Sequence, residues 1–174
     1  MKRLFLAFEL PHYFKEELIA FKSLVSLNGP IRWVPIENLH VTLFFIGNFH
    51  ELLLDKLKDE LNQVLIKHHM FELEFDKLVV MPKKRPYMVW AQFKPNPEFK
   101  ELYQKAALYF SQKPNHEINI HATLARFKGN TNVVLCQPLS IEKSVKIKQV
   151  VLYESILNPD GVEYLPLQQY RLNN

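Results

Sequence analysis

The spacing of apolar residues divides the chain into short strands and three amphipathic helices. Apolar residues at intervals of three and four indicate helices between Pro11 and Asn28, over residues 50–68, and over residues 99–109. Alternating or continuous apolar runs predict strands over residues 3–9, 32–34, 40–46, 71–76, 87–93, 118–126, 149–156 and 162–171. The irregular order of strands and helices, with hairpin-like neighbours, is typical of an α+β fold with antiparallel sheets.

The ends of these elements follow from breaker residues. The first helix would continue through Val25 to Asn28-Gly29-Pro30, and the second would bury a face that includes Val64. Gly47 would end the strand over residues 40–46. Pro159-Asp160-Gly161 predicts a turn between the last two strands, because proline restricts φ and glycine accepts positive φ.

One short pattern occurs twice, in two of the predicted strands. It reads His40-Val41-Thr42-Leu43 in the first half of the chain and His121-Ala122-Thr123-Leu124 in the second. Residues i and i+2 of a strand point to the same face, so each histidine would project beside its threonine. A single copy would be read as structural, but two matching copies indicate a shared site. We therefore expect residues 1–174 to form a single domain of two similar lobes, with the two histidine–threonine pairs facing one cleft.

Composition limits the kind of substrate and the cellular location that fit such a site. The chain has 174 residues, a net charge of +4 and 13 Phe, 7 Tyr and 2 Trp residues, which supply a large core. A mildly basic surface suits an anionic substrate but does not by itself indicate a nucleic-acid groove. Cys136 is the only cysteine, so an internal disulfide is excluded. The first apolar run is too short for a signal peptide or a membrane span. We expect a cytoplasmic protein that does not contact a membrane.

The paired residue types suit acid–base chemistry on a phosphoester. Imidazole titrates near neutral pH, so one histidine can take a proton from water while the other gives a proton to the departing oxygen. Phosphoryl transfer favours attacking and leaving oxygens in line, which two opposed strands can provide. Thr42 and Thr123 can donate hydrogen bonds to phosphate oxygens. Arg126 adds a fixed positive charge, but it must follow a bulge or a strand end to share the face of His121.

Other kinds of site lack support in the sequence. No carboxylate cluster stands near either motif, and there is no His-Glu-x-x-His pattern or glycine-rich phosphate loop, so we expect neither a metal nor a cofactor. The remaining histidines are expected at the surface or in capping positions: His12, His50, His68, His69 and His116. The basic loop Lys83-Lys84-Arg85 is either a solvated turn or a contact for a polynucleotide backbone.

At these motifs the chain resembles the two-histidine phosphoesterase superfamily, whose mark is a repeated His-x-Thr/Ser-x. It is most similar to the 2′-5′ RNA ligase family, also called RNA 2′,3′-cyclic phosphodiesterases. Further similar segments are Arg3–Pro11, Trp33-Val34, Asn38-Leu39 before the first motif, Phe45-Ile46-Gly47 after it, Pro86, Val89, Trp90, Ala125-Arg126, Leu152–Ser155 and Gly161–Tyr164. The resemblance therefore covers nearly the whole chain.

This resemblance implies a bilobal, pseudo-twofold fold around a metal-free cleft. It also implies hydrolysis of a ribose 2′,3′-cyclic phosphate at an RNA end to a 2′-phosphate, with reversible 2′-5′ RNA ligation. In these terms His40 would be the proton donor and His121 the proton acceptor, whereas Thr42, Thr123 and Arg126 would bind the phosphate. Many relatives carry a basic residue directly after the first motif's leucine, where this chain has Phe44, so binding of the RNA backbone could be weaker here or supplied by the basic loop.

Two other functions remain open from the sequence. The same chemistry could act on small cyclic nucleotides, or the motifs could form an RNA-binding module without catalysis. Two intact histidines argue against mere phosphate binding, which arginine or lysine does better. The working hypothesis is a monomeric cyclic phosphodiesterase acting on RNA ends.

Overall fold

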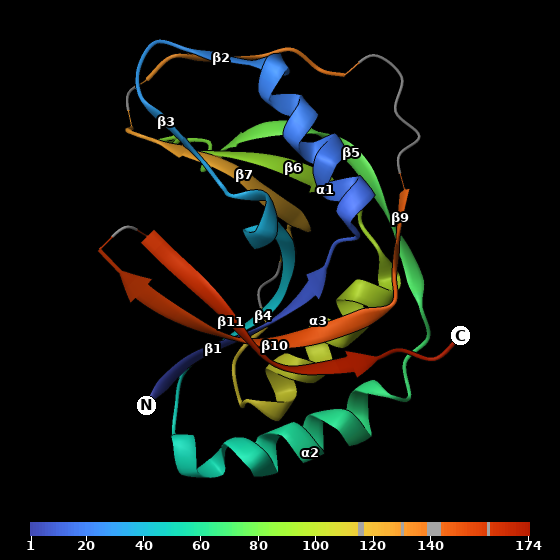
Figure 1. Ribbon diagram of the computed structural model, residues 1–174. Coiled ribbons are helices and arrows are strands. Elements are labelled where there is room, and N and C mark those ends of the chain that lie inside the picture. Colours follow the sequence, from blue (N-terminus) through green and yellow to red (C-terminus); the bar gives the residue numbers. More distant parts are fainter. Residues whose placement is uncertain (115–116, 130, 139–143, 160) are drawn as a thin grey trace.

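The computed structural model describes residues 1–114, 117–129, 131–138, 144–159 and 161–174. His116, expected at the surface or in a capping position, and Asp160 of the last predicted turn lie outside these described residues. The strands are β1 (Lys2–Glu9), β2 (Val25–Leu27), β3 (Ile31–Trp33), β4 (His40–Phe49), β5 (Phe71–Met81), β6 (Met88–Phe93), β7 (His121–Phe127), β8 (Val133–Leu135), β9 (Ser144–Ile147), β10 (Gln149–Asn158) and β11 (Gly161–Arg171). The helices are α1 (His12–Ala20), α2 (Leu54–Leu65) and α3 (Pro97–Tyr109), with 3-10 turns η1 (Phe21–Leu24), η2 (Ile36–Asn38) and η3 (Glu51–Leu53) (Figure 1).

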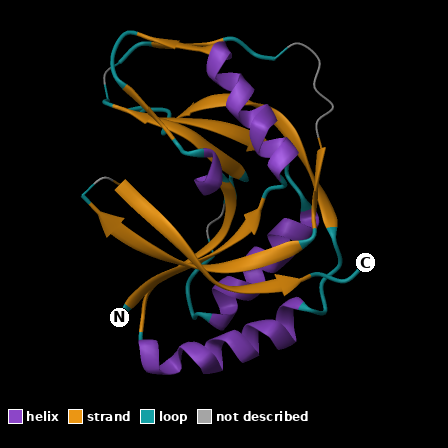
Figure 2. Ribbon diagram, viewed as in Figure 1, coloured by secondary structure: helices purple, strands orange, loops and turns teal. Residues whose placement is uncertain are grey.

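Nine strands form one curled antiparallel sheet. Eight of them follow the order β11-β10-β1-β4-β7-β6-β5-β9, and β3 pairs with β7 beside this path. β2 and β8 form a separate two-stranded ribbon. Figure 2 shows the sheet bent into two lobes, with the β10–β11 hairpin facing the lobe of β3 and β7. The predicted α+β class with antiparallel sheets in two lobes is confirmed.

The two lobes are not the two halves of the chain. One lobe holds β1, β4, β10 and β11, whereas the other holds β3, β5, β6 and β7. Helix α1 follows a strand of the first lobe but packs on the second, where its Phe14 ring lies 6.1 Å from that of Phe93. Helix α3 does the reverse, since its Phe99 ring lies 5.5 Å from that of Phe8 on β1. The chain therefore crosses between lobes several times.

The first predicted helix is too long. Helix α1 ends at Ala20 and passes through η1, so that Val25 begins strand β2. The apolar spacing continues through this region, but Val25 pairs with Leu135, a partner 110 residues away that no local pattern shows. In α2 the buried face is Leu54, Leu57, Leu61 and Leu65. Val64 is 39% exposed, so its assignment to that face was wrong.

Two strand boundaries also differ from the prediction. β4 continues through Gly47, where φ is +84°, to Phe49. Glycine adopts this conformation at little cost, so it allows an irregular pairing with β1 instead of ending the strand. The odd-numbered positions from Val145 to Tyr153 are apolar apart from Gln149, which suits a single strand, but the segment forms two strands, because β9 pairs with β5 whereas β10 pairs with β1. Among the described residues no helix is both long and apolar enough to cross a membrane.

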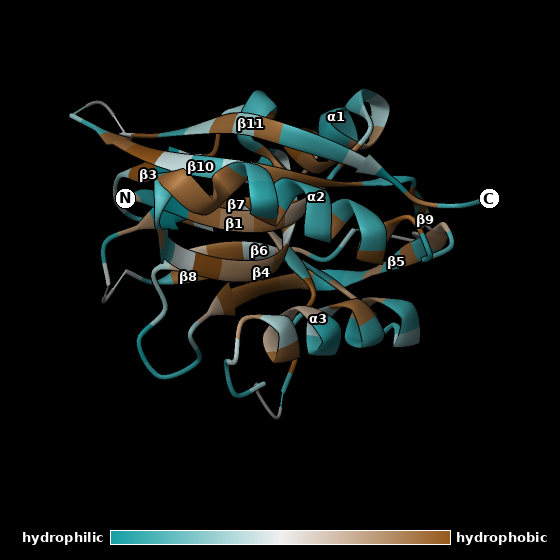
Figure 3. Cartoon of the chain, turned by 90° about the horizontal axis from the view of Figure 1, so that it is seen from below, coloured by the Kyte–Doolittle hydropathy of each residue, from teal (hydrophilic) through white to brown (hydrophobic). Residues whose placement is uncertain are grey.

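The core lies between the sheet and the helices. Strands β1, β4 and β6 are coloured as largely hydrophobic in Figure 3, whereas α2 and α3 also carry hydrophilic residues. The largest side chains that are almost wholly buried include Phe8, Phe14, Phe93, Phe99 and Tyr170. Burying a residue of this size contributes about 1.5–3 kcal/mol. The packed helices thus hold the strands that carry the two motifs.

Candidate active site

The two motif strands touch at one antiparallel residue pair. Val41 of β4 lies opposite Ala122 of β7, and both are fully buried. Neighbouring residues of a strand point to opposite faces, so the flanking motif residues project away from this buried pair. The two motifs are therefore related by a pseudo-twofold axis that passes between Val41 and Ala122.

This register brings the two motifs into one constellation. Continuing the antiparallel pairing by one residue on each side sets His40 across from Thr123, and His121 across from Thr42. All four side chains are half-buried and line the same cleft. Each histidine thus has its own threonine two residues along and the other motif's threonine across the strand.

Both imidazoles are oriented in the same way. The Nδ1 atom of His40 lies 2.7 Å from the carbonyl oxygen of Asn38, and Nδ1 of His121 lies 2.7 Å from that of Asn119. A carbonyl only accepts, so in each ring Nδ1 carries a proton and donates it, which leaves Nε2 for chemistry. Nε2 of His40 lies 3.1 Å from Oγ1 of Thr42. In the neutral rings each Nε2 is therefore an acceptor, ready to take a proton.

Each of the two imidazoles packs against its own set of aromatic rings. Trp90 stacks on His121, with ring centroids 3.6 Å apart and an interplanar angle of 15°. Tyr164 meets His40 edge-on at 5.1 Å, and Phe5 lies 5.3 Å from the same ring. These contacts fix the ring planes and exclude water from the rings. Trp90 and Tyr164 lay inside segments that resemble the family, yet no local pattern indicated their contact with the histidines.

Burial shifts both imidazoles toward the neutral form. The pKa of His40 is lowered from 6.5 to about 4, mainly by burial and to a smaller extent by the charges of His121 and Lys15, although the bond to Asn38 opposes the shift. Burial likewise lowers the pKa of His121, and the charge of Arg126 acts in the same direction. At neutral pH the empty site therefore holds two uncharged histidines.

A bulge aims Arg126 into the cleft. β6 pairs Trp90 with Thr123 and Val89 with Ala125, so Leu124 is an extra residue on β7. Leu124 and Ala125 are consequently both buried, and the next residue returns to the face of Thr123. Arg126 lines the cleft, and its guanidinium donates to the Met88 sulfur at 2.9 Å.

β4 contains a matching bulge, which corrects the expectation about Phe44. Its pairing with β1 skips Leu43, so Leu43 and Phe44 are both buried. Phe44 stacks on Phe110 at 5.6 Å, on the face opposite the cleft. A basic side chain at this position would enter the core here instead of reaching a phosphate. Phe45, which is 64% exposed, lines the cleft in the place that Arg126 occupies on β7.

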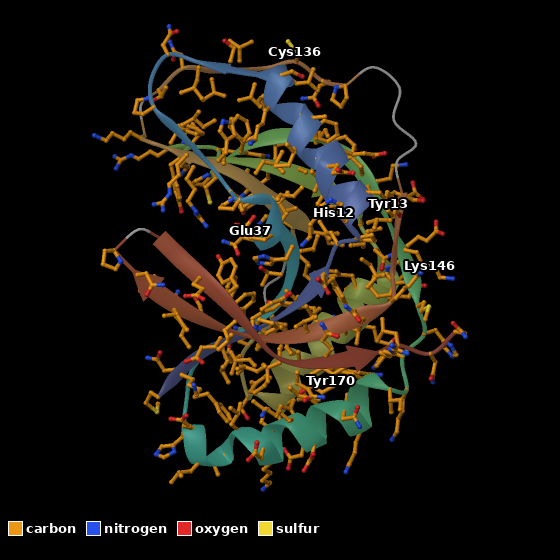
Figure 4. All side chains as sticks on the ribbon, in the orientation of Figure 1. His12, Tyr13, Glu37, Cys136, Lys146 and Tyr170 are labelled. Atoms are coloured by element: carbon orange, nitrogen blue, oxygen red, sulfur yellow. The ribbon has the colours of Figure 1, made fainter. Side chains whose placement is uncertain are left out.

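The cleft between the lobes has a volume of about 680 Å³. Three arginines line it: Arg3 on β1, Arg32 on β3 and Arg126 on β7. Arg32 and Arg126 are directly opposite each other in the β3–β7 pair. The sequence singled out only Arg126, because Arg3 and Arg32 reach the cleft through strand pairing that no local spacing shows. Figure 4 shows the side chains of both lobes turned toward this space.

Comparisons with known proteins agree with this arrangement. A model of the family described as LigT-like phosphoesterases matches residues 8–90. The RNA 2′,3′-cyclic phosphodiesterases of Methanothermobacter thermautotrophicus and Methanocaldococcus jannaschii are 28% and 29% identical to this chain, covering 98% and 97% of it and 98% and 99% of their own lengths. The chain is similar to the LigT-like phosphoesterases. The crystal structure of E. coli LigT with 3′-AMP has the same fold, with a TM-score of 0.83, 23% identity and 99% coverage of each chain.

The remaining candidate residues lie away from the histidine pair. His12, His50 and His69 are exposed, and His68 is half-buried beside Lys105. Lys83, Lys84 and Arg85 are exposed in the loop before β6 and do not line the cleft. Their contact with a polynucleotide stays a prediction. In the described parts of the chain, no three His, Cys, Asp or Glu side chains are grouped as metal ligands would be.

Proposed function

We propose that this protein hydrolyses the 2′,3′-cyclic phosphate at an RNA end and leaves a 2′-phosphate. One observation carries the proposal. Two half-buried imidazoles, each with Nδ1 bound to a carbonyl, present Nε2 to one cleft beside a threonine. The relatives named RNA 2′,3′-cyclic phosphodiesterases match nearly the full chain and indicate the substrate. The site is complete in one chain, which we take to act as a cytoplasmic monomer.

The reaction needs one proton donor and one proton acceptor. Water attacks phosphorus while Nε2 of His121 takes its proton, so a new phosphorus–oxygen bond forms. The bond from phosphorus to the ribose 3′ oxygen breaks, and Nε2 of His40 gives that oxygen a proton. The products are a 2′-phosphate and a free 3′ hydroxyl. The assignment of donor and acceptor follows the family resemblance, since both rings have the same hydrogen bond.

The substrate itself helps to set the protonation states. His40 can act as a donor only with a proton on Nε2, and its pKa of about 4 leaves it neutral in the empty site. A bound phosphodiester anion favours the imidazolium and raises that pKa. Binding of the cyclic phosphate should therefore be accompanied by proton uptake. The side-chain hydroxyls of Thr42 and Thr123 and the guanidinium of Arg126 can donate hydrogen bonds to the phosphate oxygens.

Ligation would use the same groups. An RNA 5′ hydroxyl in place of water would attack the cyclic phosphate and form a 2′-5′ linkage, with the two proton transfers unchanged. The cleft of about 680 Å³ is large enough for a nucleotide at this centre. Exposed Phe45 offers a ring on which a base can stack.

The deciding experiment is a product assay on an oligonucleotide with a 2′,3′-cyclic phosphate, in excess EDTA. Phosphorus NMR should show a 2′-phosphate with no 3′-phosphate. His40→Ala and His121→Ala should each lower kcat by about 10²–10⁴-fold, because each removes one proton transfer. The wild-type profile of kcat/KM against pH should be bell-shaped, since one imidazole must be charged and the other neutral.

Matched controls separate chemistry from folding and from binding. His12→Ala removes an exposed histidine and should retain wild-type turnover. Circular dichroism should show the same fold in all three variants. Full turnover in either motif variant would refute the two-histidine mechanism. RNA binding without turnover by the wild-type protein would instead favour a binding module, and equal kcat/KM for a cyclic mononucleotide would favour small cyclic nucleotides.

A further inference from the structure

Lys15 is a buried charged side chain with no role in the reaction described above. Among the described residues it is the only charged one that is buried, with 8% of its surface exposed. It lies on helix α1, between Phe14 and Leu18 in a buried part of the helix, and does not line the cleft. Burying a charged group is costly unless a partner compensates. Its presence therefore calls for a reason besides packing.

The side chain of Lys15 is bound to the turn that orients His40. Its Nζ donates to the carbonyl oxygen of Glu37 at 3.3 Å. Glu37 is the middle residue of turn η2, and Figure 4 shows it between the two lobes. The next residue, Asn38, supplies the carbonyl that accepts from Nδ1 of His40. Two successive carbonyls of one turn thus bind the lysine and the histidine.

This turn is also held from the opposite lobe. The amide Nδ2 of Asn38 donates to the carbonyl of Val162 on β11 at 3.4 Å. Helix α1 packs on the lobe of β6, whereas β11 belongs to the lobe of β4. The turn that orients His40 is therefore tied to both lobes. The Asn119 carbonyl that orients His121 comes from an irregular segment instead, so the two histidines are supported differently.

We propose that Lys15 is a positioning residue, whose buried side chain holds turn η2 so that the Asn38 carbonyl keeps the His40 ring in one orientation and one tautomer. This inference rests on the proposed function for its kinetic consequence only. The hydrogen bonds on which it depends belong to the protein alone. Lys15 touches no substrate, because it lies outside the cleft.

The charge of Lys15 has a second effect on the same ring. It disfavours the imidazolium of His40, as does the charge of His121 across the cleft. The other titratable groups around the ring are Tyr153 and Tyr164, together with Glu9, which pairs with His40 across β1 and β4. A proton that the substrate places on His40 is consequently more acidic, and more readily transferred, than it would be without the lysine.

The test replaces Lys15 with Met, which has a similar length but no charge and no donor. Nitrogen-15 NMR of the substrate-free protein should show a rise in the pKa of His40 and a mixture of tautomers, where wild type has the proton on Nδ1. With the cyclic-phosphate oligonucleotide, kcat should fall about tenfold while KM changes less than twofold, because a misplaced group costs rate more than binding. Lys15→Arg, which retains charge and donors, should restore the wild-type spectrum and most of kcat.

Lys100→Met, an exposed lysine on α3, is the matched control and should match wild type in every measurement. Should Lys15→Met not fold, Lys15→Gln, which keeps a shorter donor, takes its place in the same measurements. A folded variant with an unchanged His40 titration and tautomer would overturn the proposal. Because the NMR readout needs no turnover, it tests the role of Lys15 even if the wild-type protein fails to hydrolyse the cyclic phosphate.

Discussion

At the scale of single residues, the site depends on side chains whose ordinary chemistry is altered by burial. Histidine is a common surface residue type, but here aromatic rings pack against His40 and His121 and shield part of each imidazole from water. The carbonyls of Asn38 and Asn119 then decide which nitrogen carries the proton. In the proposed mechanism a bound anion would restore the charge of one of these neutral imidazoles, which suits proton transfer near neutral pH.

Burial of these histidines predicts how stability depends on pH. The pKa of His40 is about 4 in the folded protein and 6.5 without burial, so the unfolded chain binds more protons between these values. The stabilising contribution of neutral His40 should therefore be complete above pH 6.5. As the pH drops toward 4, the free energy of unfolding should fall by up to about 1.4 kcal/mol per pH unit for one histidine. His121 shifts in the same direction.

Urea unfolding at several pH values between 4 and 7 measures this slope. His40→Gln removes one of the buried titrations and should flatten the curve, whereas His12→Gln, at an exposed site, should leave it as in wild type. A slope that does not change in His40→Gln would show that the imidazole is not held neutral by the fold.

At the scale of elements, irregular strands place the site. The bulges in β4 and β7 each add one residue after the motif threonine, and so return Phe45 and Arg126 to the cleft face. A regular strand would point Phe44 and Ala125 there instead. The same device in both strands explains why the two motifs remain equivalent over more than the four residues they share.

The backbone geometry of the β10–β11 hairpin predicts that replacing Gly161 lowers stability. Its φ is +146°, a conformation that residues with a Cβ rarely adopt, so any side chain there strains the backbone even after the flexible guanidinium of Arg32 moves aside. Gly161→Ala should therefore lower the free energy of unfolding by about 1–3 kcal/mol, measured by urea denaturation. The matched change Gly129→Ala, where a Cβ meets no atom and φ is not positive, should have little effect. Equal losses in the two variants would contradict this account.

At the scale of the whole molecule, function depends on interleaving. Because α1 and α3 each cross to the lobe of the other motif, the two lobes cannot separate without unpacking the core. The packing of these helices across the two lobes therefore fixes the width of the cleft. The arginines that line it come from three strands, two of them in one lobe and one in the other.

This arrangement predicts a preference for oligonucleotides. Arg32 lies on β3 directly opposite Arg126 of β7, and both line the cleft. Because Arg126 is assigned to the reacting phosphate, the charge of Arg32 beside it is placed to meet a backbone phosphate further along the RNA. Arg32→Gln should raise KM about tenfold for a cyclic-phosphate oligonucleotide and leave a cyclic mononucleotide nearly unchanged.

The comparison of kcat and KM for the two substrates, at one salt concentration, measures this effect. Lys128→Gln, an exposed basic residue beyond β7, provides the control and should affect neither substrate as strongly. Equal losses on both substrates would place Arg32 at the reacting phosphate, and no loss on either would exclude it from binding.

The sequence by itself determined most of the elements and the two motifs. Apolar spacing is a local property, so α2, α3, β5, β6 and the last hairpin could be predicted from it. The repeated His-x-Thr pattern likewise indicated four of the residues that line the cleft, because strand geometry puts residues i and i+2 on one face.

Tertiary structure alone decided how these parts meet. The end of α1, the split between β9 and β10, and the interleaving of the lobes depend on partners far along the chain, which no local spacing records. The same is true of Trp90 on His121, of Arg32 beside Arg126, and of the link from Lys15 to the turn before His40. Burial and strand register are properties of the packed molecule, and they convert two common histidines into one site.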